Sequence, residues 1–207
     1  MSIVKLNNQS VKNATSFGSI SALGTMILIK KLSASSSATL DFVNGSNGVV
    51  LDDTYKEYIF TFKNIHASTD DVLLQFQTDT GTNTNYNQTV TTTFVSARHG
   101  ESNSPASLSY ITNRDEAQTT NFVKLNYDIG DNNDDNICGI LQLFNPSSDT
   151  FVKNFLSETI DNGRAGGSAQ NNFVGGYFNT TTPLTRVQFK MSSGNIASGD
   201  ICLYGIA

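Results

Sequence analysis

Four aspartates form the densest acidic group of this 207-residue chain: Asp128, Asp131, Asp134 and Asp135, within the run DIGDNNDDN. Carboxylate and amide oxygens gathered in a loop are the ligands that Ca²⁺ prefers. The spacing departs from the EF-hand loop, because it has no glycine at the sixth position and no glutamate at the twelfth. A solvated turn is therefore the preferred interpretation, and a calcium site is the alternative.

One histidine lies close in sequence to residues that could form a hydrolytic site with it. His99 stands beside Glu101 in the segment ARHGE, and Ser102 and Ser104 follow it. A Ser/His/Glu triad needs its members to converge in space, which closeness in sequence does not supply. The G-x-S-x-G nucleophile elbow is also missing. We expect His99 to be an exposed loop residue and His66 to lie at a strand end.

The remaining chemistry-bearing residues predict no cofactor and no metal centre. Cys138 and Cys202 lie in apolar, strand-like segments, so we expect buried free thiols, with a disulfide as the alternative. Two cysteines and two separated histidines do not make a zinc site. No glycine-rich phosphate loop opens a helix. Paired carboxylates for glycoside cleavage depend on a separation in space, so a glycan-degrading enzyme stays as the least favoured hypothesis.

Loop tyrosines are the residues that could bind sugar. Tyr55, Tyr86 and Tyr110 lie in segments that we expect to be exposed, and tyrosine rings stack on sugars. A jelly-roll sandwich is a common host for lectin sites. Exposed tyrosine is equally ordinary as protein interface area. Both uses remain open from the sequence.

Composition predicts a β-rich chain that does not bind nucleic acid. Asn, Ser and Thr occur 23 times each, only 15% of residues are charged, and 13 Phe and 7 Tyr provide material for a core. Thr, Phe and Tyr favour strands, whereas Asn, Ser and Gly favour turns. The net charge of −5 comes with no cluster of Lys and Arg, so we expect no contact with packaged DNA. The apolar run Met26–Ile29 is too short to cross a bilayer, and we expect neither a membrane segment nor a signal peptide.

Strand-length apolar windows follow one another between turn residues. We expect strands at 25–32, 38–43, 58–63, 72–78, 89–97, 108–111, 122–127, 137–144, 151–159, 173–178, 186–191 and 200–204. With no amphipathic helix, this pattern predicts an all-β fold, a jelly-roll-like antiparallel β-sandwich over residues 24–207. Residues 1–23 are polar and weakly patterned, and we expect them to form an extended N-terminal arm.

Three local patterns lead to specific expectations. Tyr58, Phe60 and Phe62 alternate with polar neighbours, which predicts one shared face of a strand. The two windows after Pro183 predict a closing β-hairpin through Gly194 and Gly199. The run Met26–Ile29 is either a core strand or a docking strand, and the core strand is preferred.

Several segments, taken in their order along the chain, carry a family resemblance. They are YIFTFKNIH (58–66), LFNPSS (143–148), GYFN (176–179), SSGNI (192–196) and LYG (203–205). Together they resemble structural proteins of tailed phages of aquatic bacteria, cyanophages in particular. The resemblance implies a virion component, either a capsid decoration or a part of the tail and its fibres. It implies no catalytic residue.

The sequence and the resemblance together favour a non-enzymatic virion structural protein, a decoration or cement protein that binds and stabilises the capsid surface. The alternative is a tail or tail-fibre module that recognises host surface glycan. We expect a homo-oligomer, a trimer by analogy with shell three-fold axes, made in the host cytoplasm and located in the virion. The candidate partner-binding residues are Ser10, Val11, Phe17 and Ile20 in the arm, and Tyr86, Arg98, His99 and Tyr110 in the loops.

Overall fold

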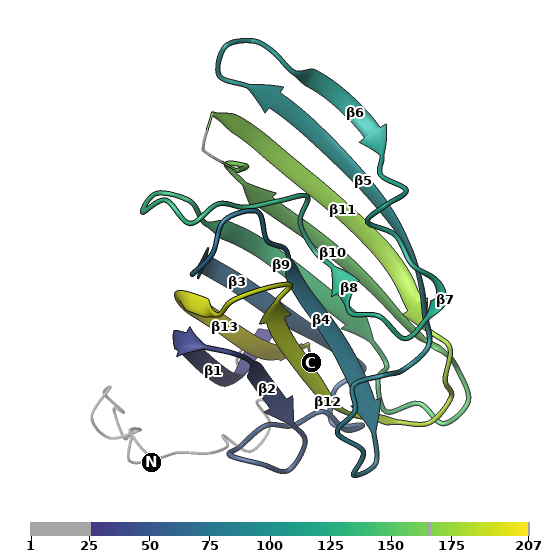
Figure 1. Ribbon diagram of the computed structural model, residues 1–207. Coiled ribbons are helices and arrows are strands. Elements are labelled where there is room, and N and C mark those ends of the chain that lie inside the picture. The colour runs from purple at the N-terminus through teal and green to yellow at the C-terminus, as the bar shows by residue number, and fades with distance from the viewer. Residues whose placement is uncertain (1–25, 165–166, 207) are drawn as a thin grey trace, which may run out of the picture.

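The computed structural model describes residues 26–164 and 167–206, and this part of the chain consists of strands and connecting loops (Figure 1). The strands are β1 (Met26–Ser37), β2 (Leu40–Val43), β3 (Glu57–Ala67), β4 (Leu74–Thr80), β5 (Val90–Gly100), β6 (Ala106–Tyr110), β7 (Ala117–Thr119), β8 (Val123–Lys124), β9 (Ile137–Phe144), β10 (Lys153–Asp161), β11 (Ser168–Phe178), β12 (Leu184–Met191) and β13 (Ile196–Ile206). The arm expected at residues 1–23 lies outside the described residues.

Two antiparallel sheets of unequal size pack face to face. The large sheet has nine strands in the order β1-β13-β3-β9-β10-β11-β5-β6, with β7 also paired to β5. The small sheet has four strands in the order β2-β12-β4-β8 and lies in front of the large one in Figure 1. The predicted all-β sandwich is confirmed. Since the small sheet is less than half as wide, the large sheet determines which surfaces the molecule presents.

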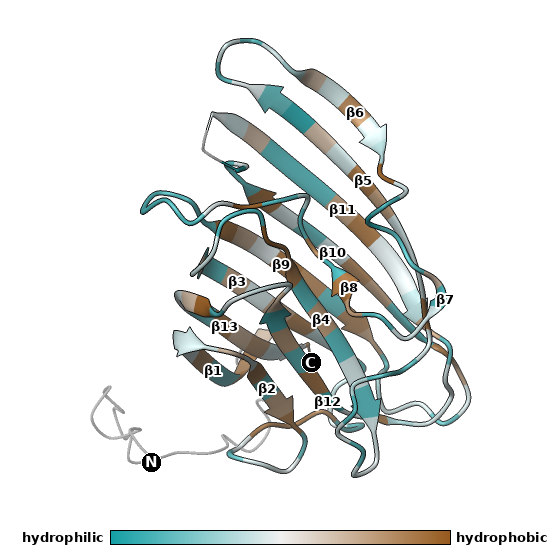
Figure 2. Ribbon diagram, viewed as in Figure 1, coloured by the Kyte–Doolittle hydropathy of each residue, from teal (hydrophilic) through white to brown (hydrophobic). Residues whose placement is uncertain are grey.

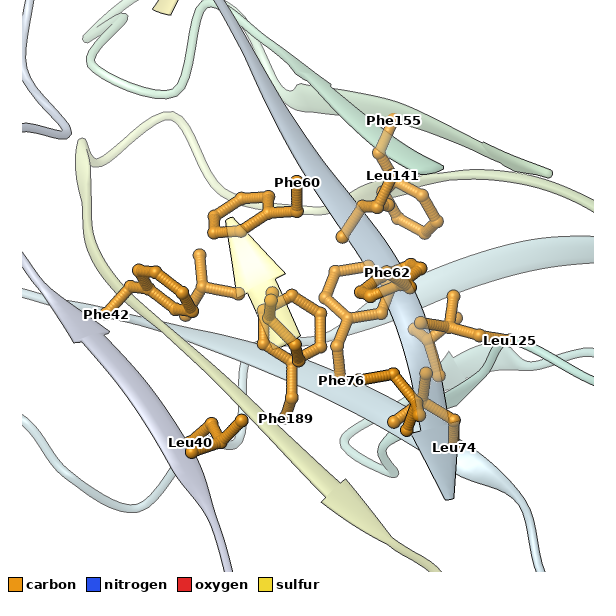
Figure 3. Packing of buried hydrophobic residues seen from close by; sticks show 14 of the residues in the cluster. Leu40, Phe42, Phe60, Phe62, Leu74, Phe76, Leu125, Leu141, Phe155 and Phe189 are labelled. Atoms are coloured by element: carbon orange, nitrogen blue, oxygen red, sulfur yellow. The ribbon is translucent and has the colours of Figure 1, made fainter. Parts of the chain in front are cut away.

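A cluster of phenylalanine rings joins the two sheets (Figure 3). Phe189 of the small sheet contacts Phe60 and Phe62 of the large sheet, with ring centroids 5.2 and 5.4 Å apart. Phe76 of the small sheet packs edge-to-face on Phe155 at 5.1 Å. These rings are almost fully buried, so they supply much of the hydrophobic stabilisation of the fold.

Figure 2 shows apolar (brown) and polar (teal) residues following one another along the strands of the large sheet. Tyr58, Phe60 and Phe62 all point into the core, with at most 3% of each residue exposed. The predicted shared face of this strand is therefore confirmed. The predicted strand 137–144 has the same bounds in the structure as β9.

The predicted closing hairpin is wrong. β12 pairs with β2 and β4 in the small sheet, whereas β13 pairs with β1 and β3 in the large sheet. The connection between them therefore crosses from one sheet to the other. Local alternation identified both strands but could not show their partners, because strand pairing is decided by segments far away in the sequence.

The run Met26–Ile29 lies in β1, at one edge of the large sheet. Met26, Ile27 and Leu28 are 37–55% exposed, and Ile29 is partly buried against the core. The preferred prediction of a core strand is thus wrong for the first three residues. β1 pairs with β13 alone, and the side chains of these three residues remain exposed at this edge of the large sheet.

Candidate functional site

The candidate partner-binding residues Tyr86, Arg98, His99 and Tyr110 do not form one exposed cluster. Tyr86 is only 8% exposed, and its hydroxyl donates a hydrogen bond to Asp41 Oδ1 at 2.6 Å. Burial raises the pKa of Tyr86, and the bond to Asp41 adds to this effect. The expectation of an exposed Tyr86 is therefore wrong. Tyr55, expected to be exposed as well, is half-buried and packs edge-to-face on Tyr58 at 5.7 Å.

Arg98 and His99 point to opposite faces of β5, because successive residues of a strand alternate. Arg98 faces inward, with its guanidinium carbon 4.5 Å from the ring centroid of Tyr127. His99 is exposed on the outer face. Tyr110 of β6 is 51% exposed, and its hydroxyl donates to Asp115 Oδ2 at 2.6 Å. Arg98, His99 and Tyr110 lie in strands, so their expected loop positions are wrong, and His99 and Tyr110 remain as surface residues.

The arm candidates Ser10, Val11, Phe17 and Ile20 lie outside the described residues. Their predicted role in binding a partner stays a prediction.

The acidic run is not the fully solvated turn that we expected. Asp135 is only 1% exposed and accepts hydrogen bonds from Asn132 and from Asn162 Nδ2. Its backbone oxygen lies 2.6 Å from His66 Nδ1, so this loop is fastened to the end of β3. Within residues 26–164 and 167–206, no group of three or more His, Cys, Asp or Glu residues could hold a metal ion.

The serines after His99 form a hydrogen bond within their own turn. Ser102 Oγ donates to the backbone oxygen of Ser104 at 3.1 Å. This contact belongs to the β5–β6 turn and leaves the hydroxyl directed at the backbone. Cys138 and Cys202 are free thiols, as predicted, but they are half-buried, not fully buried.

An inversion of polarity in the large sheet is the feature that sequence reasoning missed. Along β10 every second residue is buried, and beyond Phe155 the buried side chains are the polar Ser157, Thr159 and Asp161. The apolar Leu156 and Ile160 point the opposite way and are 55% and 44% exposed. The neighbouring strand β11 repeats this arrangement. We call residues 156–161 and 170–173 the inverted segment.

Hydrogen bonds explain why polar side chains are tolerated on the inner side. Asn172 Nδ2 donates to Asp161 Oδ2 at 3.0 Å, and Asn172 Oδ1 accepts from Ser96 Oγ at 3.0 Å. Thr159 Oγ1 donates to the backbone oxygen of Leu125 at 2.6 Å, within the loop that covers this end of the sheet. Buried polar groups that are hydrogen-bonded in this way avoid most of the desolvation penalty.

Asp161 is the ionisable residue among the buried polar side chains of the inverted segment. Burial raises its pKa to about 7, and the nearby Asp128 adds to the effect, against hydrogen bonds from the Gly163 amide and Asn172. Asp128 in turn accepts from Gln170 Nε2 at 3.1 Å. Asp161 is only 5% exposed, so the cost of its burial bears on the stability of the fold, and the residue also lines a hollow at this end of the sheet.

The outer side of the same strands carries a continuous apolar surface. Six side chains share this side of the sheet, each 41–73% exposed, and we call them the outer apolar face: Leu108, Tyr110, Ile140, Leu156, Ile160 and Phe173. Strand register places them in adjacent rows. Val95 pairs with Tyr110 and Phe173, Glu158 pairs with Phe173 and Ile140, and Ile160 lies in the next row. The surface therefore extends over five strands, from β6 to β9.

Two hollows open on this side. One of about 390 Å³ lies at its centre between Val95, Ile140, Leu156 and Phe173. Gly175, which pairs with Leu156, leaves room there because it has no side chain. The other, of about 560 Å³, lies at the sheet end and is lined by His99, Glu101, Asn136 and other residues.

Glu158 is the one carboxylate within the outer apolar face. It lies between Ile140 and Phe173 in the register, and its Oε1 accepts from Asn171 Nδ2 at 3.1 Å. A charged group at this position remains solvated only while the face is open to water. Any partner that covers the face must accommodate it.

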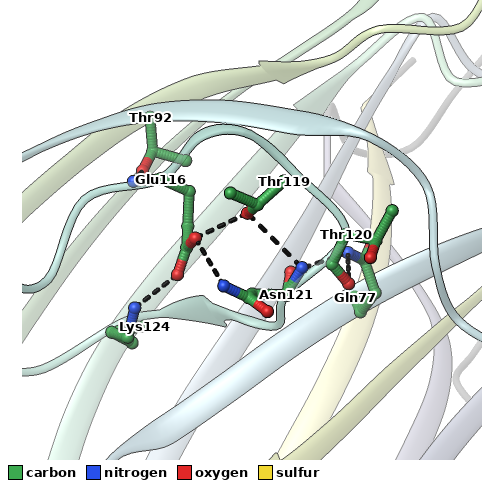
Figure 4. Close-up of polar contacts among 7 residues, drawn as sticks. All are labelled: Gln77, Thr92, Glu116, Thr119, Thr120, Asn121 and Lys124. Atoms are coloured by element: carbon green, nitrogen blue, oxygen red, sulfur yellow. Dashed lines mark hydrogen bonds and ion pairs between the residues drawn. The ribbon is translucent and has the colours of Figure 1, made fainter.

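A second polar network ties the loop after β6 to the body of the sandwich (Figure 4). Glu116 is 5% exposed and forms an ion pair with Lys124. Its other oxygen accepts from Thr119 and from Asn121 Nδ2. Burial alone would raise the pKa of Glu116, but these hydrogen bonds outweigh it and the pKa is lowered. The network holds the loop against β5, where the Glu116 amide donates to Thr92 Oγ1.

Comparison of the chain with protein-family models, with curated proteins and with solved structures finds no match. In the part of the chain that the structure describes, no helix has the length and apolar character needed to cross a membrane.

Proposed function

We propose that this chain is a non-enzymatic structural protein of a tailed-phage virion, a capsid decoration that acts by binding other protein surfaces. The observation that carries the assembly role is the inverted segment, where polar side chains are buried and apolar ones are exposed. Apolar side chains stabilise a structure when water is removed from them. Their placement on the outer side supports a face that is covered in the assembled state.

The size of the outer apolar face supports the same role. A large side chain of this kind offers about 150–250 Å², so six of them at about half exposure leave roughly 600 Å². This is at the upper end of what a typical monomer exposes as its largest patch, and such patches often mark interaction sites. The remaining exposed surface is rich in Asn, Ser and Thr.

The virion as the place of assembly rests on the resemblance of the segments at 58–66, 143–148, 176–179, 192–196 and 203–205 to phage structural proteins. We further propose that residues 1–23 anchor the protein on the capsid through Ser10, Val11, Phe17 and Ile20. An arm that becomes ordered on a neighbour can bind a large surface. The other partner would be further copies of this chain, since virion parts are symmetric oligomers.

A tail module that recognises host glycan is the second candidate. The hollow of about 560 Å³ beside His99 favours it, because amide and carboxylate side chains such as Asn136, Asn162 and Glu101 line it. Such groups can hydrogen-bond to sugar hydroxyls.

Binding of the purified chain to capsids that lack it tests the main proposal. The full chain is expected to co-sediment with capsids to a fixed copy number. A variant without residues 2–20 is expected to fold and to remain in the supernatant, and Thr82→Ala, a change in an exposed loop, is the matched control. Binding to tails or to host glycan with no binding to capsids would contradict the decoration role and favour the second candidate.

A further inference from the structure

We propose that a second copy of this chain covers the outer apolar face, so that two large sheets pack back to back around a two-fold axis. The assembly would then contain four layers of sheet, with the small sheets outermost. This inference rests on the assembly role proposed above, but it does not depend on the virion as the place of assembly.

The shape of the face suits its own copy. The outer apolar face lies on five neighbouring antiparallel strands, β6, β5, β11, β10 and β9. Two sheets with such faces can pack at about 10 Å, as the two layers of a sandwich do. An interface around a two-fold axis uses the same patch on both partners. One broad face therefore leads to a closed pair, whereas a ring of three needs two different patches that fit each other.

The exposed area agrees with what a stable dimer needs. A standard interface covers about 800 Å² on each partner, with an apolar centre and a polar rim. The roughly 600 Å² estimated for the six side chains would form the centre. Asn154 lies at the border of the face on the outer side, whereas Asn171 and Thr93 lie among the six side chains and add polar groups within it.

When the row across the face is reversed, apolar residues meet at its two ends and at its centre, and Val95 lies over Glu158. Tyr110, Val95, Phe173, Glu158 and Ile140 follow one another from β6 to β9, one residue per strand. A two-fold axis parallel to β11 near Phe173 reverses this row in the second copy. Tyr110 of one copy then lies over Ile140 of the other, beside the central hollow of about 390 Å³. The same contact is made twice.

Glu158 provides a specific test of the proposed dimer. Covering this carboxylate with an apolar copy removes it from water, which opposes association unless it is neutralised or paired. Its hydrogen bond from Asn171 compensates for part of the loss. Replacing Glu158 by the uncharged Gln is therefore expected to strengthen the dimer. A face that stays open to water would show no such gain, and a basic partner would bind the variant more weakly.

Sedimentation equilibrium of the purified full chain, from about 1 to 100 μM, is the experiment. The wild type is expected to show a reversible monomer–dimer equilibrium. Leu156→Glu and, separately, Phe173→Glu are expected to weaken dimerisation by more than about 100-fold, because each dimer then buries two additional charges. Glu158→Gln is expected to tighten it by about 10-fold. Phe151→Glu is the matched control, since Phe151 is 67% exposed outside the face, and it should change nothing.

Three outcomes overturn the proposal: a monomer at 100 μM, a trimer, or a dimer that Leu156→Glu and Phe173→Glu leave intact. In the second and third cases another surface joins the copies, and in the first the face belongs to a different partner, such as residues 1–25 or a capsid protein. The experiment contains no capsids, so a negative result leaves the proposed binding to the virion unchanged. Failure of the capsid test, in turn, leaves the dimer standing.

Discussion

Asp161 allows the buried polar end of the sandwich to be tested through its pH dependence. Its side chain is 5% exposed, and the pKa is raised to about 7, mainly by burial, from an ordinary value of 3.8. The change is Asp161→Asn, which keeps the size of the side chain and removes its charge. The Gly163 amide can still donate to the new Asn oxygen, and the amide of Asn172 can turn to pair with the new NH₂ group.

The sign follows from the two pKa values. Below pH 4 Asp161 is protonated in both the folded and the unfolded state, and it does not penalise folding. Between pH 4 and 7 the unfolded chain releases the proton while the folded chain retains it, so the free energy of unfolding falls as pH rises. One pKa unit corresponds to about 1.36 kcal/mol, and the penalty at pH 8 therefore reaches at most about 4 kcal/mol. Asp161→Asn removes this penalty.

The assay is urea denaturation of wild type and Asp161→Asn at pH 4, 5, 6, 7 and 8. The difference between the two free energies of unfolding should be small at pH 4 and should grow to several kcal/mol in favour of the variant at pH 8. Asp53→Asn, which removes an exposed carboxylate, is the control and should give a flat difference. A flat difference for Asp161→Asn, or a variant that is less stable at pH 8, would refute the argument from burial.

Three further predictions concern the core, a buried lysine and the arm. Phe60→Ala should lower the free energy of unfolding by about 3–5 kcal/mol, because Phe60 is fully buried against the rings of Phe42 and Phe189; a near-neutral denaturant midpoint would refute this placement. Lys153→Met should cost about 3 kcal/mol or more, because the three N–H groups of the buried ammonium are shared among four backbone oxygens within 3.4 Å; thermal unfolding measures this loss, and an unchanged Tm speaks against a structural role. Deleting residues 2–20 should leave the unfolding transition intact, since the described residues form a continuous buried core among themselves, while it abolishes incorporation into particles; normal occupancy of the truncated chain would rule out the anchoring role.

The sequence predicted the positions of the strands better than it predicted which strands pair with each other. The alternation of Tyr58, Phe60 and Phe62 identified an inner face because all three inward residues are aromatic. The alternation from Arg186 to Met191 was equally clear, yet the predicted hairpin was wrong. A pattern of period two shows that a strand has two faces, but the sheet it joins is decided by contacts between distant segments.

The outer apolar face was harder to predict, because along β10 the polar side chains beyond Phe155 are buried and the apolar ones are exposed. In β10 both faces mix apolar and polar residues, so alternation alone could not tell inside from outside. Phe155 points inward next to Ser157, and Leu156 points outward next to Glu158. The loop that covers the inner side comes from around residue 125, which no local pattern around β10 reveals. Tyr86 was misplaced for a similar reason, since its partner Asp41 lies 45 residues away.

Cryo-electron microscopy of the intact particle tests the central claim most directly. The account predicts density for this chain at regular positions on the capsid shell, with the outer apolar face of each copy covered by protein. Density on the tail alone, or copies on the shell whose outer apolar faces are open to solvent, would contradict it.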